Sequence, residues 1–196
     1  MNCIRTHIIS FAMLLMCATS SAQMKWNQSY QTYINQYKDL AIEQMLRYRI
    51  PASITLAQGL FESRAGQSDL VRQGNNHFGI KCHNWTGPTQ YHDDDARGEC
   101  FRVYQDAKES YEDHSRFLAK QPRYSRLFSL NTTDYKGWAH GLKSCGYATN
   151  PQYANKLIQI IELYRLQDYD KAKSYDRFMA THSGTDVPIN AEGTLH

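Results

Sequence analysis

The sequence predicts an α+β fold, in which a single, mostly helical domain carries a small β-hairpin lobe. Apolar and aromatic residues recur every three or four positions through most of the chain, which is the period of amphipathic helices. This period is lost between residues 81 and 104, where short strand-like stretches flank turn-prone residues. With 196 residues, of which 41% are hydrophobic and 21% charged, the chain has the size of one domain with tails.

The first 22 residues have the pattern of a secretory signal peptide. Arg5 precedes the apolar run "IISFAMLLMCA", and the small residues "SSA" ending at Ala22 offer a cleavage site. This run is too short to span a bilayer, and no later segment approaches the ~20 apolar residues of a transmembrane helix. We therefore expect an exported protein, in the periplasm, the cell envelope or the medium, with no transmembrane anchor. Lipid attachment at Cys17 is less favoured, because the bulky Met16 precedes it.

A first helix is predicted from Trp26 to Tyr48, where apolar and aromatic residues follow the helical period. Pro51 ends it and suits the first turn of a second helix, predicted from Pro51 to Arg64 with Gly66 as its stop. The remaining expected elements are a polar turn over 67–80, a β-hairpin over 81–104, and helices over 107–120, 124–130, 133–144 and 150–166. The domain is expected to span 26–168, and 169–196 to form a disordered tail, because large apolar residues become scarce there.

Removal of the signal peptide leaves three cysteines, Cys82, Cys100 and Cys145. In an oxidising compartment the first two are expected to form a disulfide at the base of the hairpin, with Cys145 as an unpaired thiol. A zinc site made from these residues and the nearby histidines is not favoured, because the spacing of the candidates fits no common zinc pattern. Those candidates are His77, Cys82, His83, His92 and Cys100.

The net charge of +3 is modest and the chain contains no dense Lys/Arg run, so nucleic acid is not expected as a partner. An anionic polymer such as a cell wall is compatible with this charge. We expect a monomer that needs no cofactor or metal.

Glu62 stands at the end of the second predicted helix. Ile54, Ala57, Leu60 and Phe61 form the core stripe of this helix, and Thr55, Gln58 and Glu62 fall on an adjacent face. The apolar neighbours and the negative end of the helix dipole both favour the protonated carboxyl, which predicts a raised pKa. Such an acid suits protonation of a leaving sugar oxygen. The alternative is a solvated carboxylate paired with Arg64 or Arg72.

Three blocks, "IPASITLAQGLFESRAGQSDL", "NNHFGIK" and "GYATNPQYANKLI", occur in this order. Over roughly Tyr30 to Leu166 the chain resembles the bacterial peptidoglycan N-acetylglucosaminidases of glycoside hydrolase family 73, the domains of flagellar muramidases and autolysins. The resemblance implies a lysozyme-like α+β fold with Glu62 as the general acid, facing a groove for the glycan strand. It also implies an endo-β-N-acetylglucosaminidase that hydrolyses the β-1,4 bond after N-acetylglucosamine in peptidoglycan.

The second catalytic group is less clear from the resemblance. The hairpin carries Asp93, Asp94, Asp95 and Glu99, of which Asp94 and Asp95 are our candidates. Tyr147 matches a tyrosine that the family keeps near the acid, and it could steady the substrate's own N-acetyl group as nucleophile. We favour this route or an inverting attack by water over a covalent enzyme intermediate.

Aromatic rings pack on the apolar faces of sugars, and amides supply both a donor and an acceptor. The predicted substrate-binding residues are therefore Asn76, Phe78, Trp85, Tyr124 and Tyr153. Two alternatives are a lytic transglycosylase of lysozyme-like fold, which also uses one helix-end glutamate, and a non-catalytic wall-binding domain, which would lack the acid. A nucleophilic pair of Cys145 or Cys82 with a histidine has no supporting local signature.

Overall fold

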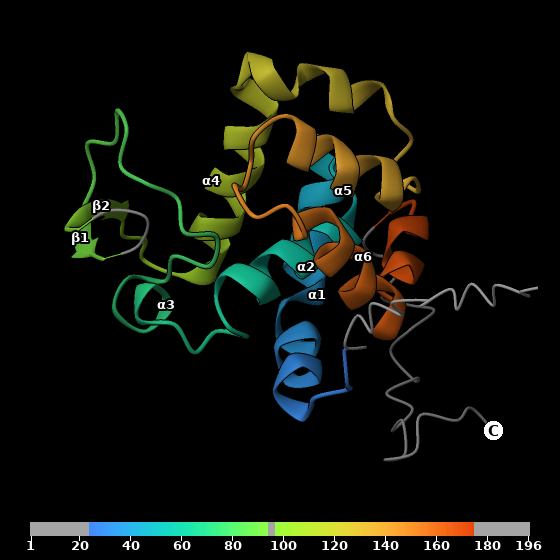
Figure 1. Cartoon of the computed structure of the whole chain (residues 1–196), viewed down its shortest axis with the longest axis horizontal. Helices are drawn as coiled ribbons and strands as arrows, with labels where there is room; N and C mark the ends of the chain where they lie inside the picture. Colours follow the sequence, from blue (N-terminus) through green and yellow to red (C-terminus); the bar gives the residue numbers. More distant parts are fainter. Residues whose placement is uncertain (1–23, 94–96, 175–196) are drawn as a thin grey trace, which may run out of the picture.

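The computed structural model describes residues 24–93 and 97–174, which form a helical body and a small lobe (Figure 1). The body consists, in chain order, of α1 (Gln28–Tyr48), α2 (Ala52–Glu62), α4 (Ala107–Lys120), the 3-10 helix η1 (Pro122–Ser129), α5 (Tyr135–Ser144), α6 (Tyr153–Leu163) and the 3-10 helix η2 (Leu166–Lys171). The lobe holds α3 (Asp69–Gly74), β1 (Thr89–His92) and β2 (Glu99–Arg102). The predicted α+β class is confirmed.

Helix α2 is the centre of the body and packs against α1, α5, α6 and η2. Every residue from Ala52 to Leu60 is buried, so Thr55 and Gln58, on the face adjacent to the predicted core stripe, belong to the core as well. A helix covered on all sides buries its polar positions as well, and these then need partners inside the protein. At Gly59 a Cβ atom would lie 2.6 Å from the hydroxyl of Tyr33, so this glycine permits the close approach of α1 and α2.

The start of α1 is capped locally, whereas the start of α2 is capped from far along the chain. Asn27 Oδ1 accepts a 2.7 Å hydrogen bond from the Ser29 amide at the first turn of α1. Pro51 gives α2 no side-chain cap. Instead, the carboxylate of Asp170 in η2 accepts hydrogen bonds from the amide and the hydroxyl of Ser53, at 2.8 and 2.6 Å.

The predicted domain boundary at residue 168 falls inside η2. Leu166 and Asp170 are both buried against the body, so the packed part of the chain continues past this boundary to Lys171. Composition did not predict this packing, because residues 169–171 contain few apolar side chains. Their contact with the body depends on the buried Asp170, which bonds to Ser53. The signal peptide and residues 175–196 lie outside the described residues.

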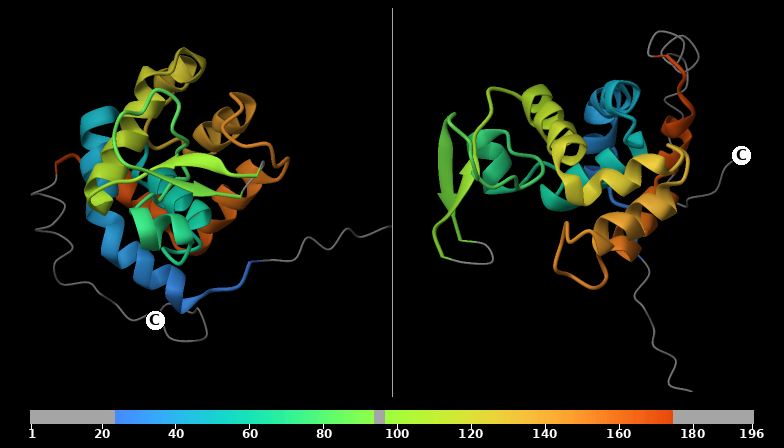
Figure 2. Two further views of the ribbon diagram at one scale, coloured as in Figure 1. Left: turned by 90° about the vertical axis from the view of Figure 1, so that its left-hand side faces the viewer. Right: turned by 90° about the horizontal axis from the view of Figure 1, so that it is seen from above.

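The lobe contains the predicted hairpin. Strands β1 and β2 are antiparallel, with Tyr91 opposite Cys100 and His92 opposite Glu99. The predicted disulfide between Cys82 and Cys100 is confirmed. Figure 1 and the right-hand view of Figure 2 show the two strands at one edge of the molecule, next to α3.

Helix α3 is an element that the sequence reasoning read as a polar turn. Its six residues are too few to establish an apolar period. Tertiary hydrogen bonds hold it instead, since Gln90 Nε2 donates to the carbonyl of Leu70 at 3.0 Å and the amide of Tyr104 donates to the carbonyl of Gly74 at 2.9 Å. It ends at Asn75, whose φ of 50° is left-handed.

The later helices follow the predicted periods with small shifts. Asp106 caps α4 by accepting from the amide of Glu109 at 2.8 Å, and Glu109 accepts from the amide of Gln105 at 2.8 Å. Helix α6 begins two residues after Pro151, and its residues Leu157, Ile160 and Ile161 are buried, as is Tyr164 just after its end. Within residues 24–93 and 97–174, no helix combines the length and hydropathy needed to cross a bilayer.

Candidate active site

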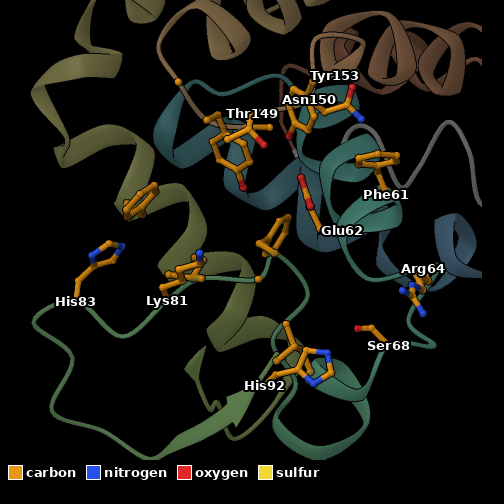
Figure 3. A pocket seen from close by; sticks show the side chains of 18 of the residues that line it. Phe61, Glu62, Arg64, Ser68, Lys81, His83, His92, Thr149, Asn150 and Tyr153 are labelled. Atoms are coloured by element: carbon orange, nitrogen blue, oxygen red, sulfur yellow. The ribbon is translucent and has the colours of Figure 1, made fainter. Parts of the chain in front are cut away.

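A groove of about 860 Å³ lies between the lobe and the helical body. The lobe contributes residues of α3 and His92 of β1, and the body contributes the end of α2, Phe117 of α4, the start of η1 and residues 146–153. Figure 3 shows Lys81, His83 and His92 on one side of the groove and Thr149 and Asn150 on the other. The fold thus brings together residues as far apart in the sequence as Phe61 and Tyr153.

Glu62 is the last residue of α2 and is half-buried in this groove. The chain reverses immediately after it, because residues 64–66 all adopt left-handed conformations with φ values of 51°, 56° and 79°. The amide of Ala65 closes the helix by donating to the carbonyl of Leu60 at 2.9 Å. The helix thus ends at Glu62, and the carboxylate is directed toward residues 149–150 (Figure 3).

Three tyrosines line the groove beside Glu62. The rings of Tyr147 and Tyr153 stack with centroids 5.7 Å apart, and the rings of Tyr124 and Tyr147 are tilted with centroids 6.2 Å apart. Burial raises the pKa of Tyr147 and of Tyr153 well above the ordinary value, and the negative charge of Glu62 raises both further. Both hydroxyls therefore stay protonated and can donate hydrogen bonds at any physiological pH.

The hydroxyl of Tyr153 links two residues of α2. Gln58 Nε2 donates to Tyr153 Oη at 3.0 Å. A hydrogen bond with the side chain of Glu62 raises the pKa of Tyr153, and this direction makes the hydroxyl the donor and the carboxylate the acceptor. Gln58 and Glu62 are one helical turn apart, so α6 is joined to α2 at the position of the acid.

Phe78 forms part of the groove wall and rests on two buried rings. Its ring stacks on His114 with centroids 3.9 Å apart and meets Tyr111 edge-on at 4.9 Å. Burial lowers the pKa of His114 to about 3, so the imidazole under Phe78 is neutral. The wall at this point is an uncharged aromatic surface suited to the apolar face of a ligand ring.

Five residues that the sequence predicted for the site line the groove, namely Glu62, Phe78, Tyr124, Tyr147 and Tyr153. Asn76 does not. It is buried, its Nδ2 donates to the carbonyls of Ile80 and Arg102 at 3.0 and 2.9 Å, and its Oδ1 accepts from the amide of Ile80 at 3.0 Å. This amide satisfies the backbone of the turn that leads into the hairpin, which explains its place in "NNHFGIK".

Trp85 also lies away from the groove lining. Its Nε1 donates to the carbonyl of Pro88 at 2.9 Å, and the guanidinium of Arg102 lies 5.0 Å from the centroid of its ring. The ring stabilises the base of the hairpin. Amide and aromatic side chains that suit a sugar also suit a tight turn, and the sequence does not separate these two uses.

Of the four carboxylates on the hairpin, Asp94 and Asp95 fall outside the described residues. Asp93 shapes the turn, with Oδ1 accepting from the Gly98 amide at 2.7 Å, and Glu99 forms an ion pair with Lys81 at 2.7 Å. Asp69, the first residue of α3, lines the groove. The sequence did not single it out, because residues 67–80 were predicted to form a polar turn.

The groove also has a basic lining that sequence reasoning did not assign to the site. Exposed cations on short elements follow no period that would predict a shared surface. The sequence suggested Arg64 and Arg72 only as possible ion-pair partners of Glu62. The basic and imidazole side chains of the lining are Arg64, Arg72, Lys81, His83, His92 and Arg123.

No group of three His, Cys, Asp or Glu side chains is placed to hold a metal ion in residues 24–93 and 97–174. Cys82 and Cys100 are joined to each other, and His77 Nδ1 is hydrogen-bonded to the hydroxyl of Tyr33 at 2.9 Å. Cys145 is a free, half-buried thiol, as predicted, whose sulfur accepts from Arg126 Nε at 3.3 Å.

The arrangement is suited to acid catalysis on a ligand that lies along the groove. A half-buried carboxyl group stands beside two protonated tyrosines and opposite a lobe that carries cations. A protonated Glu62 could give its proton to an acetal oxygen of the ligand, while the tyrosine hydroxyls bind polar atoms near the reacting centre.

Comparison with known proteins gives consistent matches. Residues 38–166 match the family model Glucosaminidase, described as mannosyl-glycoprotein endo-beta-N-acetylglucosaminidase. The exo-glucosaminidase LytG of Bacillus subtilis is 35% identical over 136 residues, which are 64% of this chain and 48% of LytG. The peptidoglycan hydrolase FlgJ of Salmonella typhimurium is 32% identical over 139 residues, which are 64% of this chain and 43% of FlgJ. The chain thus matches less than half the length of these two relatives.

Among solved structures, the catalytic domain of the autolysin Auto from Listeria monocytogenes has a similar fold. The TM-score is 0.62 at 30% sequence identity, and the match covers 76% of this chain and 91% of that domain. This likeness confirms the predicted lysozyme-like α+β arrangement.

Proposed function

Because the chain belongs to the glucosaminidase family, we propose that it is an exported endo-β-N-acetylglucosaminidase that cleaves the β-1,4 bond after N-acetylglucosamine in peptidoglycan. LytG is named as an exo-glucosaminidase, FlgJ as a peptidoglycan hydrolase and Auto as an autolysin. The name of FlgJ points to peptidoglycan as the substrate, and the name of LytG points to glucosaminidase activity. The partner is then a peptidoglycan glycan strand, on which the protein acts as a monomer without a cofactor.

The position of Glu62 carries this proposal. Glu62 is the last residue of α2, and its carboxyl group lies in the groove. It is hydrogen-bonded to Tyr153, the first residue of α6. In our proposal Glu62 protonates the glycosidic oxygen as the bond to the sugar breaks. The bond is polarised most in the transition state, so the proton donor stabilises the transition state more than the bound substrate.

The second group of the reaction is part of the proposal. We propose that Tyr147 binds the N-acetyl group of the substrate and steadies it as the internal nucleophile, since its protonated hydroxyl lies close enough to feel the charge of Glu62. An inverting attack by water, with a carboxylate as base, is the second route. Asp94 and Asp95 stay candidates for that base, and Asp69 joins them because it lines the groove.

The decisive experiment is Glu62→Gln, which keeps the shape of the side chain and removes its acidic proton. We expect cell-wall clearing in a zymogram to fall by several orders of magnitude. Binding to insoluble peptidoglycan and the thermal unfolding midpoint should stay close to those of the wild type. Unchanged clearing would rule out Glu62 as the acid, and a wild type without clearing would favour a non-catalytic wall-binding domain.

Product analysis separates the remaining possibilities. Endo cleavage shortens long strands early in the reaction, whereas exo cleavage, the mode in the name of LytG, releases small products from strand ends. A hydrolase leaves reducing N-acetylglucosamine ends, whereas a lytic transglycosylase leaves anhydromuramic acid. A comparison of three single variants, Asp69→Asn, Asp94→Asn and Asp95→Asn, in the same assay would show which carboxylate, if any, serves as the base.

Export is proposed from the first 22 residues, which lie outside the described part of the chain. Cleavage after Ala22 predicts a mature protein that begins at Gln23. Sequencing the amino terminus of the protein recovered from the cell exterior or periplasm tests this cleavage site, and a lipid-modified Cys17 would contradict it.

A further inference from the structure

Three arginines from three different elements line the groove. Arg64 lies in the turn after α2, Arg72 on α3 and Arg123 at the start of η1, so the cations stand on both the lobe and the body. Figure 3 shows Arg64 next to Ser68, at the edge of the groove beyond Glu62. The acidic side chains among the described lining residues are Glu62 and Asp69.

Two of these guanidinium groups, those of Arg72 and Arg123, are held in place by neutral partners. Arg72 donates from Nε and Nη2 to the carbonyl of Gln67, at 2.9 and 2.6 Å. The guanidinium carbon of Arg123 lies 4.7 Å from the ring centroid of Tyr124. A neutral carbonyl and an aromatic ring orient a guanidinium but leave its full charge available to a ligand.

Lys81, another cation of the groove lining, differs from these arginines because it forms an ion pair. Lys81 is paired with Glu99 at 2.7 Å, and Arg102, behind the hairpin, is paired with Asp113 at 2.8 Å. No such ion pair to a carboxylate of residues 24–93 or 97–174 is found for Arg64, Arg72 or Arg123. As far as residues 24–93 and 97–174 are concerned, the groove therefore presents guanidinium groups with neutral partners on both of its walls.

A guanidinium group binds carboxylates through paired hydrogen bonds, which a neutral hydroxyl or acetamide cannot match. We propose that Arg72 and Arg123 bind carboxylates carried by the glycan strand, so that the groove selects acidic strands over neutral ones. This inference rests on the proposed function. Two sources offer this chemistry in peptidoglycan, namely the peptide stems on muramic acid and the lactyl carboxylate that a strand exposes once its stems are removed.

The experiment compares four soluble strands of equal length. Two carry stems, with the carboxylates either free or converted to methylamides. Two have the stems removed, with the lactyl carboxylate either free or converted to its methylamide. Initial rates of formation of reducing ends give kcat and KM for each strand. The free form of at least one pair should be cut with a kcat/KM about tenfold higher than its neutral form, and the responding pair identifies the source.

The variants assign this preference to residues. One exposed ion pair contributes about 0.2–1 kcal/mol, or about 1.4- to 5-fold in binding. Arg72→Gln and Arg123→Gln should each reduce the preference by that amount, and the double variant should bring it to about one. The loss should lie in KM with kcat retained, because substrate and transition state carry the same carboxylates. Arg49→Gln, which removes an exposed charge outside the groove lining, is the matched control.

Ionic strength gives a further readout, because 0.5 M salt screens exposed pairs. The preference of the wild type should shrink in salt, while the rates on the neutral strands stay nearly constant. Equal rates on free and neutral strands in both pairs would overturn the inference, as would equal losses on free and neutral strands in the double variant. Failure of the proposed function looks different, since no strand would then yield reducing ends.

Discussion

Gln58 and Tyr153 lie 95 residues apart in the chain and are joined by a 3.0 Å hydrogen bond from Nε2 to Oη. Gln58 is one turn before Glu62 on the buried helix α2, and the same tyrosine hydroxyl bonds to the carboxylate of Glu62. The acid is therefore positioned by α6 as well as by its own helix. Because Gln58 already fixes the hydroxyl of Tyr153, this hydroxyl should lose little motion when the substrate binds.

Tyr153→Phe tests this positioning. The variant keeps the ring, and with it the stacking on Tyr147, but removes the donor to Glu62. We expect kcat to fall about 10- to 100-fold. The alkaline limb of the pH–rate profile should move to higher pH, because the ionised carboxylate loses a stabilising donor.

Tyr164→Phe is the matched control for this variant, since it removes a tyrosine hydroxyl that bonds to the backbone of Asn27, away from the groove lining. The control should retain the wild-type kcat and pH profile. If Tyr153→Phe behaved like the control, the hydroxyl of Tyr153 would have no part in positioning the acid.

Tyr147→Phe tests the proposed use of the substrate's N-acetyl group. If its hydroxyl steadies the acetamide as nucleophile, kcat should fall about 100- to 1,000-fold, as for the loss of other donors to a reacting centre. Substrates with increasing fluorination of the acetyl group should react progressively more slowly with the wild type, because the acetamide oxygen becomes a poorer nucleophile. A rate that is independent of fluorination would instead favour inversion with a carboxylate base.

The sequence predicted much of the fold because the long helices and the hairpin obey local rules. The period of 26–48 and 107–120 reports which side of each helix is buried, and Cys82 and Cys100 bracket turn-prone residues. Helix α3 escaped prediction because six residues held by Gln90 and Tyr104 carry no local signal. The burial of Gln58 could not be inferred either, because the residues that cover α2 come from η2 and α6, far along the chain.

The candidate site was predicted less completely. Glu62, Tyr147 and Tyr153 were predicted for the site because they sit in blocks that resemble a family, and all three line the groove. Asn76 and Trp85 lie outside the groove lining and bond to backbone carbonyls of turns, and residue types alone do not reveal that geometry. Arg72 and Arg123 went unassigned because an exposed arginine has no pattern, and only the fold shows that both face one groove.

The disulfide should contribute to the stability of the lobe. Cys82 and Cys100 are 18 residues apart, so closing this loop stabilises the folded protein by about 3 kcal/mol through the entropy of the unfolded chain. We expect Cys82→Ser/Cys100→Ser to lower the free energy of unfolding by roughly this amount in urea titrations. Reductant should destabilise the wild type to the level of the double variant and leave the variant unchanged. An equal effect of reductant on both would assign it to something other than this disulfide.

Asp170 predicts a specific dependence of stability on pH. Burial raises its pKa to about 7, and the hydrogen bonds from Ser53 offset only part of this effect. The ordinary pKa of an unfolded aspartate is near 3.9, so between about pH 4 and 7 the folded state binds a proton that the unfolded state has released. The contribution of Asp170 to stability is thus fully present below about pH 4 and is lost as pH rises to about 7. The whole shift corresponds to roughly 4 kcal/mol.

Asp170→Asn isolates this effect, because the amide resembles the protonated acid in shape and does not titrate. The pH dependence of the wild type alone does not isolate Asp170, because two buried histidines titrate in an overlapping range. Burial lowers the pKa of His77 to about 4 and that of His114 to about 3, and both shifts make stability rise with pH. The difference between the two proteins cancels these histidines. We expect the free energy of unfolding of the wild type, measured by urea denaturation, to fall relative to Asp170→Asn between pH 4 and 7 and then to level off. A difference that stays constant with pH would show that Asp170 is ionised throughout this range, with the caps from Ser53 outweighing the cost of burial.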